Sequence, residues 1–462
     1  MKKYEAYKDS GIEWIGEIPE GWEISRIKYL LEQSKDGIKI GPFGSTLTGK
    51  VDNEGEYKVY GQWNIVGKDF NAGKNFVSAE TFDALEPYHI SSGDLFISMM
   101  DTVGKCAIIP EGVAPGIMDS HVVKARLDKT KMLSKFFEYV YDKDNSNVIY
   151  SQIQKYRKGS IMDGLNSTLI KEFFVPCPSF VEQQAIVSYL DYKVDQINAS
   201  VSAINSQIDD LKAYRQSIIS ETVTKGLKSD VKMKDSGVEW IGEIPEEWEF
   251  RKIKTLLTRD SDNIKVGPFG SSLSGNDIEA EGNYWVYNQR TILDNNFTTN
   301  NSFVSDDKYQ ELKSFSVYPG DILITTRGTI GKVAIVPEGA KEGILHPCVI
   351  RFKVDESMVN KQYLKYIFND CNIMSEQVKY GSNATTIEVI YSYTLKDLKM
   401  PVPSLSEQQA IATYLDIKTS KIDSAIKSLE AQRDDLNAFK QSIISEAVTG
   451  KIDVRDWKPS IE

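Results

Sequence analysis

A glycine-rich stretch near the start of the chain has part of the spacing of a nucleotide-binding loop. Residues 44–51 read GSTLTGKV, with two glycines and a lysine where a phosphate-binding loop has them. Such a loop also needs a serine or threonine after the lysine to hold magnesium, and Val51 takes that place. A second copy of the stretch, GSSLSGND at 270–277, has no lysine. We therefore expect no ATP site here, and interpret both stretches as turns with exposed backbone amides.

Other residue types that carry chemistry form no repeated constellation. His89, His121 and His346 do not align between the two halves of the chain, which favours structural histidines over a metal site or a nucleophile. The four cysteines show no C-x-x-C spacing, which favours reduced thiols over a disulfide framework or zinc. No recurrent carboxylate pair suggests acid and base catalysis, and the [DNS]-P-P-[YFW] signature of amino-methyltransferases is missing. The chain by itself is expected not to be an enzyme.

Composition is that of an ordinary globular protein. The 462 residues are 41% apolar and 26% charged, enough for two or three domains. No apolar run approaches the eighteen or so residues that span a bilayer, and the start MKKYEAYKDSG has no apolar segment of a secretory signal. The cytoplasm is the expected location, with no membrane partner. The net charge of −11 is spread along the chain, so contacts with phosphate would come from local clusters.

The chain repeats itself along most of its length. The copies lie about 225 residues apart, far more than the roughly 20–50 residues of a solenoid unit. Three pairs illustrate the repeat: DSGIEWIGEIPEGWE at 9–23 with DSGVEWIGEIPEEWE at 235–249, IGPFGSTLTG at 40–49 with VGPFGSSLSG at 266–275, and PCPSFVEQQAIVSYLD at 176–191 with PVPSLSEQQAIATYLD at 401–416. The sequence therefore indicates a duplicated pair of domains.

Each copy has a β-rich part followed by a long helix. The first part alternates short β-branched or aromatic runs with turn residues, and contains a few helices such as SKFFEYVYD from Ser134. The second part has sequence signals for both ends of a helix, namely a capping box at the start and a glycine after the end. These are Ser179, Glu182 and Gly226 in the first copy, and Ser404, Glu407 and Gly450 in the second. The predicted fold class is α+β, with two β-rich domains separated by two long helices.

Apolar residues along both helices alternate in steps of four and three, which is the seam of a coiled coil. A helix lying on its own domain is the alternative, but two such stripes in one chain are more simply buried against each other. Thr419 and Arg433 interrupt the second seam, and either set register or face a partner. The first seam is Leu190, Val194, Ile197, Val201, Ile204, Ile208, Leu211 and Ile218; the second continues through Leu415, Ile422, Ile426, Leu429, Leu436 and Ile443.

Five duplicated strings, in this order, resemble the specificity subunit of type I restriction-modification systems. They include YKDSGIEWIGEIPEGWE, GDILITTRGTIGKVAIVPEG, P-x-P-S-x-x-E-Q-Q-A-I and QSIISE-x-V-T-G. The resemblance implies two target recognition domains, each reading half of a split, asymmetric DNA site. It also implies that the two long helices pack antiparallel and set the gap between the two half-sites of the DNA. The two domains would then be related by a pseudo-two-fold axis. The implied parts are a recognition domain at 1–178, a spacer helix at 179–226, a second recognition domain at 227–403, and a second helix with its tail at 404–462.

Partners and cofactors follow from the same resemblance. It implies double-stranded DNA, two methyltransferase subunits and, in the full complex, ATP-dependent restriction subunits. S-adenosylmethionine, ATP and magnesium are expected on those partners, with no cofactor and no metal in this chain. Two alternatives remain open at this point: a coiled-coil scaffold whose repeated domains bind protein, and the specificity part of a methylation-only system.

Residues that read different half-sites should lie where the two copies diverge inside matched frames, and should have side chains suited to base edges or phosphates. Three places meet this criterion. They are YGQWNIV against YNQRTIL, ISMMDTVGK against ITTRGTIGK, and QKYRKGSIMDG against VKYGSNATTIE. The candidate DNA-binding residues are Gln62, Trp63, Asn64, Met100, Asp101, Lys105, Lys155, Tyr156, Arg157, Lys158 and Ser160 in the first copy, and Gln289, Arg290, Arg327, Lys332, Lys379, Tyr380, Ser382, Asn383 and Thr386 in the second.

The GPFGS loops are identical in both copies, so they are expected to have a common role. The first possibility is packing, with Phe43 and Phe269 in the core and the glycines as turns. The second is binding of phosphate through backbone amides, with Lys39 and Lys265 nearby; packing is the favoured expectation. The repeated tryptophans are likewise expected to be buried, as anchors between each domain and the helices. They are Trp14, Trp22, Trp240 and Trp248.

Overall fold

A computed structural model describes residues 2–34, 36–100, 102–157, 165–238, 241–299, 301–381 and 389–459, with backbone only at 157 and 379–381. The chain forms two compact units. Unit 1 comprises Met1–Asn205 with Glu430–Glu462, and unit 2 comprises Ser206–Leu429. In the described part, no helix is both long enough and apolar enough to cross a membrane.

Four small sheets build the β-rich domain of unit 1. A hairpin comes first, formed by β1 (Tyr7–Asp9) and β2 (Glu17–Pro19), and a strand pair of β3 (Glu23–Arg26) and β11 (Phe174–Cys177) closes the domain. Between them lie a four-stranded sheet in the order β4-β10-β7-β8 and a three-stranded sheet in the order β6-β5-β9. Their strands are β4 (Ile38–Ile40), β5 (Tyr57–Tyr60), β6 (Phe76–Val77), β7 (Leu95–Ser98), β8 (Cys106–Ile108), β9 (Gly116–Met118) and β10 (Val122–Ala125).

Unit 2 repeats this arrangement strand for strand. Its sheets have the orders β12-β13, β14-β22, β15-β21-β18-β19 and β17-β16-β20. The strands are β12 (Met233–Asp235), β13 (Glu243–Pro245), β14 (Glu249–Lys252), β15 (Ile264–Val266), β16 (Tyr284–Tyr287), β17 (Phe303–Val304), β18 (Ile322–Thr325), β19 (Val333–Ile335), β20 (Gly343–Leu345), β21 (Val349–Phe352) and β22 (Lys399–Val402). The predicted duplication of an α+β domain is therefore confirmed.

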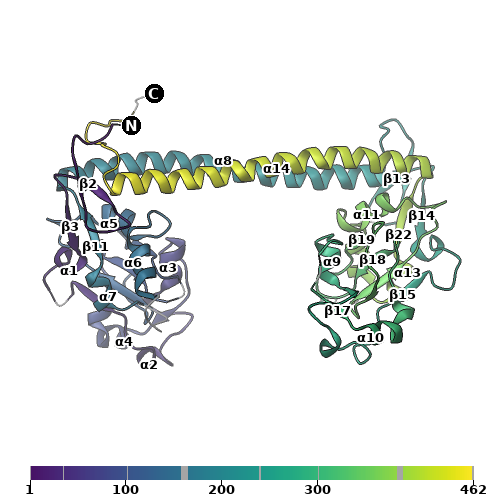
Figure 1. The fold of residues 1–462 in the computed structure, drawn as a ribbon, viewed down its shortest axis with the longest axis horizontal. Coiled ribbons are helices and arrows are strands. Elements are labelled where there is room, and N and C mark those ends of the chain that lie inside the picture. The colour runs from purple at the N-terminus through teal and green to yellow at the C-terminus, as the bar shows by residue number, and fades with distance from the viewer. Residues whose placement is uncertain are drawn as a thin grey trace. The chain divides into compact units, whose positions relative to one another are not determined.

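Short helices connect and cover these sheets (Figure 1). In unit 1 they are α1 (Ile27–Leu30), α2 (Gly44–Leu47), α3 (Gln62–Gly67), α4 (Ala79–Ala84), η1 (Glu86–Tyr88), α5 (Ser134–Tyr141), α6 (Val148–Arg157) and α7 (Ser167–Glu172). In unit 2 they are η2 (Ile253–Thr255), η3 (Gly275–Asp277), α9 (Gln289–Leu293), α10 (Asp306–Glu311), η4 (Lys313–Phe315), α11 (Lys361–Asn369), α12 (Ile373–Gly381) and α13 (Ser392–Asp397). The helix expected from Ser134 is present as α5.

The two long helices begin and end at the residues that the sequence indicates. In α8 (Phe180–Lys225) the Ser179 hydroxyl accepts a hydrogen bond from the Glu182 amide at 3.4 Å. In α14 (Leu405–Val448) Ser404 accepts from the Glu407 amide at 3.3 Å. Gly226 and Gly450 follow the helix ends with φ of 78° and 71°, a left-handed conformation that glycine adopts without strain. Local capping chemistry thus fixes the length of each helix.

Parts of the two long helices lie side by side within each unit (Figure 1). In unit 1 early residues of α8 meet late residues of α14, and in unit 2 the reverse holds, so the pairing is antiparallel. The shared core holds Leu190, Ile197 and Ile443 in unit 1, with Val194, Val201 and Leu436 packed against it. In unit 2 it holds Ile218, Leu415 and Ile422, with Leu211 and Ile426 packed against it. Ile204, Ile208 and Leu429 are also buried or half-buried.

The two polar interruptions of the second seam have different surroundings. Thr419 is 5% exposed, and its hydroxyl donates to the Leu415 carbonyl at 2.8 Å and lies 3.3 Å from the hydroxyl of Tyr366 in α11. Arg433 is half-buried and donates to Asp434 on its own helix at 2.9 Å. Thr419 therefore faces the β-rich domain of its own unit, where its polar group is satisfied.

A repeated tryptophan joins each β-rich domain to the start of its long helix. The indole nitrogen of Trp22 donates to Glu182 at 3.0 Å, and that of Trp248 donates to Glu407 at 3.2 Å. Both side chains are at most 2% exposed, as expected of anchors. Trp14 is only half-buried, whereas Trp240 lies outside the described residues.

The same tryptophans also contact the end of the other long helix. A Cβ atom added to Gly450, just after α14, would lie 3.3 Å from the Trp22 ring and 2.3 Å from the Pro19 side chain. One added to Gly226, just after α8, would lie 3.0 Å from the Trp248 ring. Each indole is therefore held between the start of one long helix and the end of the other. This explains why the segment at 9–23, which contains Trp22, is repeated at 235–249, which contains Trp248.

A buried glutamine of the E-Q-Q motif completes each joint. The Gln183 amide is fully buried, donates to the carbonyls of Lys131 and Pro178 at 2.9 and 3.0 Å, and accepts from the Leu133 amide at 2.8 Å. In unit 2, Gln408 makes the equivalent three bonds to Met358, Pro403 and Asn360. One side chain thereby satisfies three backbone groups that would otherwise be buried without partners.

Replacing Gln183 by alanine is expected to lower the free energy of unfolding by about 2–4 kcal/mol, because buried backbone groups lose their partners. The neighbouring Gln184 is exposed on the same helix turn, so Gln184→Ala is the matched control and should change stability by less than about 0.5 kcal/mol. Urea denaturation of both variants measures the difference. Equal stability of the two variants would contradict the structural role of Gln183.

The first and last described segments meet in unit 1. The Asp453 amide donates to the Lys2 carbonyl at 2.9 Å, and the Lys2 amine pairs with Asp456 at 2.8 Å. Trp457 packs on the rings of Tyr189 and Tyr192 in α8, each 5.3 Å away. The first and last described segments are therefore part of the same joint.

Candidate DNA interface

Four loops meet at one end of the two larger sheets in unit 1. β4 and β7 end there, and β10 begins there, because Val122 pairs with Ser98 and Val123 with Ile40. β5 and β9 run parallel with Tyr60 opposite Met118, so both also end there. The segments that leave these strands are 41–44, 61–63, 99–105 (residue 101 lies outside the described residues) and 119–121; residue 44 begins α2, and residues 62 and 63 begin α3. We call these four loops the first loop cluster.

Hydrogen bonds connect the members of the first loop cluster. The Asp119 amide donates to the Tyr60 carbonyl at 2.8 Å, and the Met99 amide to the His121 carbonyl at 3.2 Å. The Gln62 side-chain oxygen accepts from the hydroxyls of Ser98 at 2.9 Å and Thr102 at 3.0 Å. The loops are therefore positioned by one another as well as by the sheets.

Unit 2 places the equivalent loops in the same way. Val349 pairs with Thr325, Ile350 with Val266, and Tyr287 with Leu345. The loops 267–270, 288–290, 326–332 and 346–348 form the second loop cluster. The His346 amide donates to the Tyr287 carbonyl at 3.1 Å, and the Thr326 amide to the Cys348 carbonyl at 3.1 Å.

Three predicted readers come together in the first loop cluster. Trp63 is 38% exposed and Met100 is 39% exposed, on neighbouring loops. Gln62 is half-buried, and its side-chain oxygen is engaged as described above. The Trp63 indole lies over two glycines, since a Cβ on Gly61 or Gly73 would come within 2.6 Å of it. This part of the surface is thus an apolar and aromatic face.

The second loop cluster presents different side chains in the same frame. Arg290 replaces the tryptophan; its side chain is 84% exposed and lies 3.5 Å from Asp294. Arg327 replaces Met100, is exposed, and is held by a backbone bridge to Val389. The Gln289 amide is half-buried beside Gly328, where a Cβ would lie 3.1 Å from its nitrogen. Two exposed arginines therefore occupy the places of two apolar side chains.

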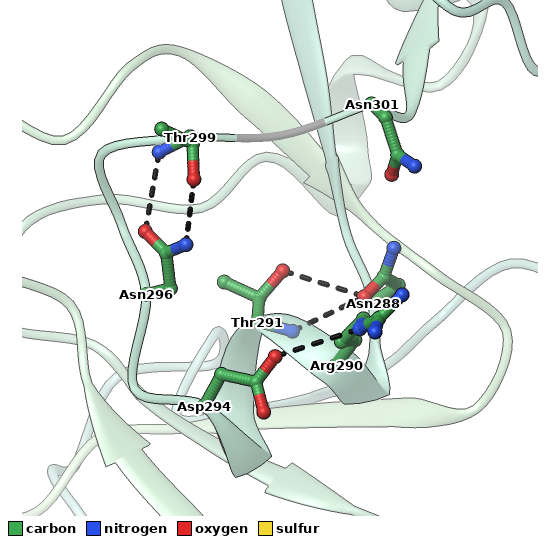
Figure 2. Close-up of a pocket in the computed structure, with 7 residues that line it drawn as sticks. All are labelled: Asn288, Arg290, Thr291, Asp294, Asn296, Thr299 and Asn301. Atoms are coloured by element: carbon green, nitrogen blue, oxygen red, sulfur yellow. Dashed lines mark hydrogen bonds and ion pairs between the residues drawn. The ribbon is translucent and has the colours of Figure 1, made fainter. Parts of the chain in front are cut away.

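A polar cavity of about 400 Å³ opens beside Arg290 (Figure 2). The close-up shows Thr291 bonded to Asn288, and Asn296 bonded to Thr299 on the facing loop. Amide, hydroxyl and guanidinium groups of this kind donate and accept hydrogen bonds as base edges do. Its lining residues are Asn288, Arg290, Thr291, Asp294, Asn296, Thr299 and Asn301.

Asn64 does not fit its predicted role as a base reader. Its side chain is fully buried, accepts from the Gly61 amide at 3.0 Å, and donates to the carbonyls of Asp69 and Ala72. All of its hydrogen-bonding groups are therefore engaged in shaping the turn at the start of α3. The equivalent residue Thr291 is also buried, at 6% exposure. The two domains differ here because α3 is capped by the Asn64 side chain, whereas α9 is capped by the side chain of Asn288.

The two predicted lysines at the base of loops 99–105 and 326–332 are engaged in the protein. Lys105 is half-buried and forms an ion pair with Asp144; burial lowers the pKa of its amine. Lys332 is half-buried, and its amine donates to the Asn369 carbonyl. Both side chains brace the loop against a neighbouring helix or turn. Their orientation does not support the predicted DNA contact.

The third predicted place is only partly described. Lys155 lies on α6 with its amine 5.2 Å from the Trp14 ring centre, and the Tyr156 ring lies 6.0 Å from that of Phe173. Both side chains thus pack toward residues outside the loop cluster. The remaining predicted residues of this place, together with Asp101 from the loop 99–105, have no described side chain: Arg157, Lys158, Ser160, Lys379, Tyr380, Ser382, Asn383 and Thr386.

Comparison with known families identifies these domains. A family model described as "Type I restriction modification DNA specificity domain" matches residues 19–210 and again residues 245–432, which is more than half of the chain. The chain belongs to this family. Each matched segment contains one loop cluster, and the two segments are called the first and second specificity domains from here on.

Relatives of the specificity domains are similar along most of their length. The putative type I restriction enzyme MjaX specificity subunit of Methanocaldococcus jannaschii is 26% identical over 453 residues, 96% of each chain. The EcoBI specificity subunit of Escherichia coli is 23% identical and covers 81% of this chain and 76% of its own. A solved structure described as "Structural basis underlying complex assembly and conformational transition of the type I R-M system" has a TM-score of 0.68 at 15% identity, covering 94% of this chain and 99% of its own. This last likeness supports the fold.

One loop of each specificity domain was not among the predicted sites. Loops 119–121 and 346–348 read DSH and HPC between strands that match closely, so divergence inside a matched frame is visible there too. His121 and His346 both lie in these loops, although at different positions. Burial lowers the pKa of His346, and its Nδ1 accepts from the Cys348 amide at 3.1 Å. Because Nδ1 accepts this hydrogen bond, the neutral ring carries its proton on Nε2 and offers a donor there.

The identical GPFGS loops are not arranged as expected. Phe43 and Phe269 are 84% and 85% exposed, so the prediction that they belong to the core is wrong. The alternative with nearby lysines is not supported either, since the Lys39 amine lies over the Tyr88 ring and the Lys265 amine over that of Phe315. The apolar anchor of each loop is instead a leucine four residues after the phenylalanine.

Across the described ranges, no group of three or more histidine, cysteine, aspartate or glutamate side chains is placed to hold a metal ion.

Proposed function

We propose that the protein is the DNA sequence-recognition subunit of a type I restriction-modification complex, in which each specificity domain reads one half of a bipartite, asymmetric site. One observation carries this proposal. Two loop clusters are built on the same strands with the same register, yet their exposed side chains differ in size, charge and hydrogen-bonding capacity. Such a pair suits two half-sites of different sequence, because base edges are distinguished by the donors, acceptors and methyl groups that they present.

The side chains of the second loop cluster suit direct contact with bases. Arg327 and Arg290 are exposed, and arginine commonly makes a pair of hydrogen bonds to guanine in the major groove. The first loop cluster presents Trp63 and Met100, which suit contact with thymine methyl groups and sugars. We infer that the two half-sites differ in base composition at the positions these residues reach.

The long helices are proposed to set the gap between the half-sites. α8 has 46 residues, which corresponds to a helix of about 70 Å. Half-sites of symmetric DNA readers are spaced by about 34–36 Å per helical turn of DNA. A helix of this length is therefore sufficient to determine a separation of one or two turns.

Catalysis is proposed to belong to partner subunits. We propose two methyltransferase subunits that bind S-adenosylmethionine, and restriction subunits that bind ATP and magnesium in the full complex. The chain contributes recognition only, which agrees with the lack of a recurrent acid and base pair or nucleophile motif in its sequence. The acidic balance of the chain means that partners would supply much of the positive charge toward phosphates.

Binding of the reconstituted complex to DNA tests the proposed function. The chain, copurified with its methyltransferase subunit, is expected to bind duplex DNA with an affinity that falls steeply as salt increases, because phosphate contacts release counterions. Mapping of methylated adenines in cells that express both subunits is expected to return one split, asymmetric motif. A complex that binds no DNA at low salt would overturn the proposal in favour of a protein-binding scaffold. Cleavage of unmodified DNA in the presence of ATP and a restriction subunit separates a complete system from a methylation-only one.

A further inference from the structure

Two phenylalanines at equivalent positions are the most exposed large apolar side chains in the described part of the chain. Phe43 is 84% exposed and Phe269 is 85% exposed. One exposed apolar side chain needs no special explanation, but the same ring exposed at the same position of both domains indicates a shared role. The repetition matters here, because both specificity domains present the ring to the same extent.

Each ring is mounted on a firmly held loop. A Cβ on Gly41 would lie 1.8 Å from the Asp119 carbonyl oxygen, and one on Gly267 would lie 2.1 Å from that of His346. The loop therefore presses directly on its neighbour in the cluster, and only glycine fits at this position. The residue after each phenylalanine is again glycine, so no side chain shields the ring from that side.

The other end of each loop is anchored in the same manner in both domains. The Phe43 carbonyl accepts from the Thr46 amide at 2.8 Å, and the Phe269 carbonyl accepts from the Ser272 amide at 2.8 Å. Leu47 and Leu273, four residues after the rings, are buried at 8% and 3% exposure. The backbone around each phenylalanine is thus fixed between the preceding strand and the buried leucine. Little backbone conformational entropy would be lost when the ring meets a partner.

The surroundings of the two rings differ although the loops are identical. The glycine before each ring lies against a different neighbouring loop, which reads DSH at 119–121 in the first domain and HPC at 346–348 in the second. Beyond these loops lie Trp63 in the first domain and Arg290 in the second. A shared residue inside a divergent surface suits a feature that both half-sites possess whatever their sequence. Stacking faces of bases are such a feature, since every base has one.

We propose that Phe43 and Phe269 each make a sequence-independent stacking contact with DNA, the ring packing on or between bases of its half-site. This inference rests on the proposed function. DNA is the chosen partner because the rings are continuous with the divergent loops that face the half-sites. Phenylalanine is among the side chains that proteins insert at base steps. The two rings would grip the duplex at both half-sites, while the neighbouring loops distinguish the bases.

Alanine variants of the complex with the methyltransferase subunit test this contact. Phe43→Ala and Phe269→Ala are each expected to weaken binding about tenfold, on DNA with the mapped motif and on DNA without it, as loss of one stacked base predicts. The methylated motif should stay the same. Phe43→Trp should retain binding, because the ring still stacks. Val181→Ala is the control, since this exposed valine (75%) lies at the start of α8.

Three results would overturn the stacking contact. Unchanged DNA affinity of both alanine variants, with a wild-type complex that binds DNA, would remove it and leave the proposed function intact. Loss of assembly with the methyltransferase subunit, measured by size-exclusion chromatography, would assign the rings to a protein interface instead. A wild-type complex that fails to bind DNA would overturn the proposed function and this inference together. Because both side chains are exposed, misfolding of the variants is not expected.

Discussion

Replacing Arg327 by alanine is expected to reduce methylation of the half-site read by the second specificity domain about 10- to 100-fold. The guanidinium is exposed on a loop whose backbone is held by a bridge to Val389, so the backbone that carries it is in place before DNA arrives. Loss of a good pair of hydrogen bonds to a base costs about 1–3 kcal/mol of discrimination, which gives a change of this size. Mapping of methylated adenines should show a relaxed base at one position of that half-site only.

Two further variants separate base recognition from general loss of charge. Arg259 is exposed in the same domain but near the opposite end of β15 and β21, beyond the bridge between Leu257 and Val354, so Arg259→Ala should leave the motif unchanged. Met100→Ala, at the equivalent place in the first domain, should alter the other half-site. An Arg327→Ala complex that modifies the wild-type motif at wild-type efficiency would remove Arg327 from the reading surface. A uniform decrease on all DNA would make it a phosphate contact instead.

Replacing Leu415 by aspartate is expected to destabilise unit 2 by at least about 4 kcal/mol. The side chain is fully buried in the core that α8 and α14 share, and the variant loses its packing and buries a carboxylate without a cationic partner. Domains have total stabilities of about 5–15 kcal/mol, so the loss is a large part of the total. We expect a low soluble yield and rapid proteolysis within residues 206–429.

The same helix provides the control for this substitution. Ile417 lies two residues further on and is 54% exposed, so Ile417→Asp introduces the same charge away from the seam. Its stability should lie within about 0.5 kcal/mol of the wild type. Equal resistance of the two variants to proteolysis would contradict the paired-helix seam. A strong effect of Ile417→Asp on complex assembly alone would show that this face contacts a partner subunit.

The overall architecture could be predicted because its signals are local. Helix caps, closing glycines and the four-three spacing of apolar residues are each set by a few neighbours in the chain, and all are found where the sequence places them. The capping box is only partly formed, since the Glu182 carboxylate bonds to the indole of Trp22. That partner lies 160 residues away and could not be inferred from local spacing.

The site was predicted less completely, because exposure depends on three-dimensional neighbours. Divergence between the copies found Trp63, Met100, Arg290 and Arg327, which lie at the exposed ends of matched strands. The same criterion also selected Asn64, since a buried amide that caps a helix can diverge as freely as a base reader. Phe43 was placed in the core because aromatic side chains usually are, whereas the structure leaves it 84% exposed and buries Leu47 of the same segment instead.

The contact between residues 2 and 453 means that the joint around Trp22 brings together the first and last described segments of unit 1. Near Trp248 the chain runs on continuously from Gly226 into the hairpin of β12 and β13, whereas near Trp22 the same step, from Gly450 to the hairpin of β1 and β2, is bridged only by non-covalent contacts. Both junctions are otherwise built alike. The joint around Trp22 is therefore held by packing and hydrogen bonds, whereas the joint around Trp248 also contains a continuous backbone.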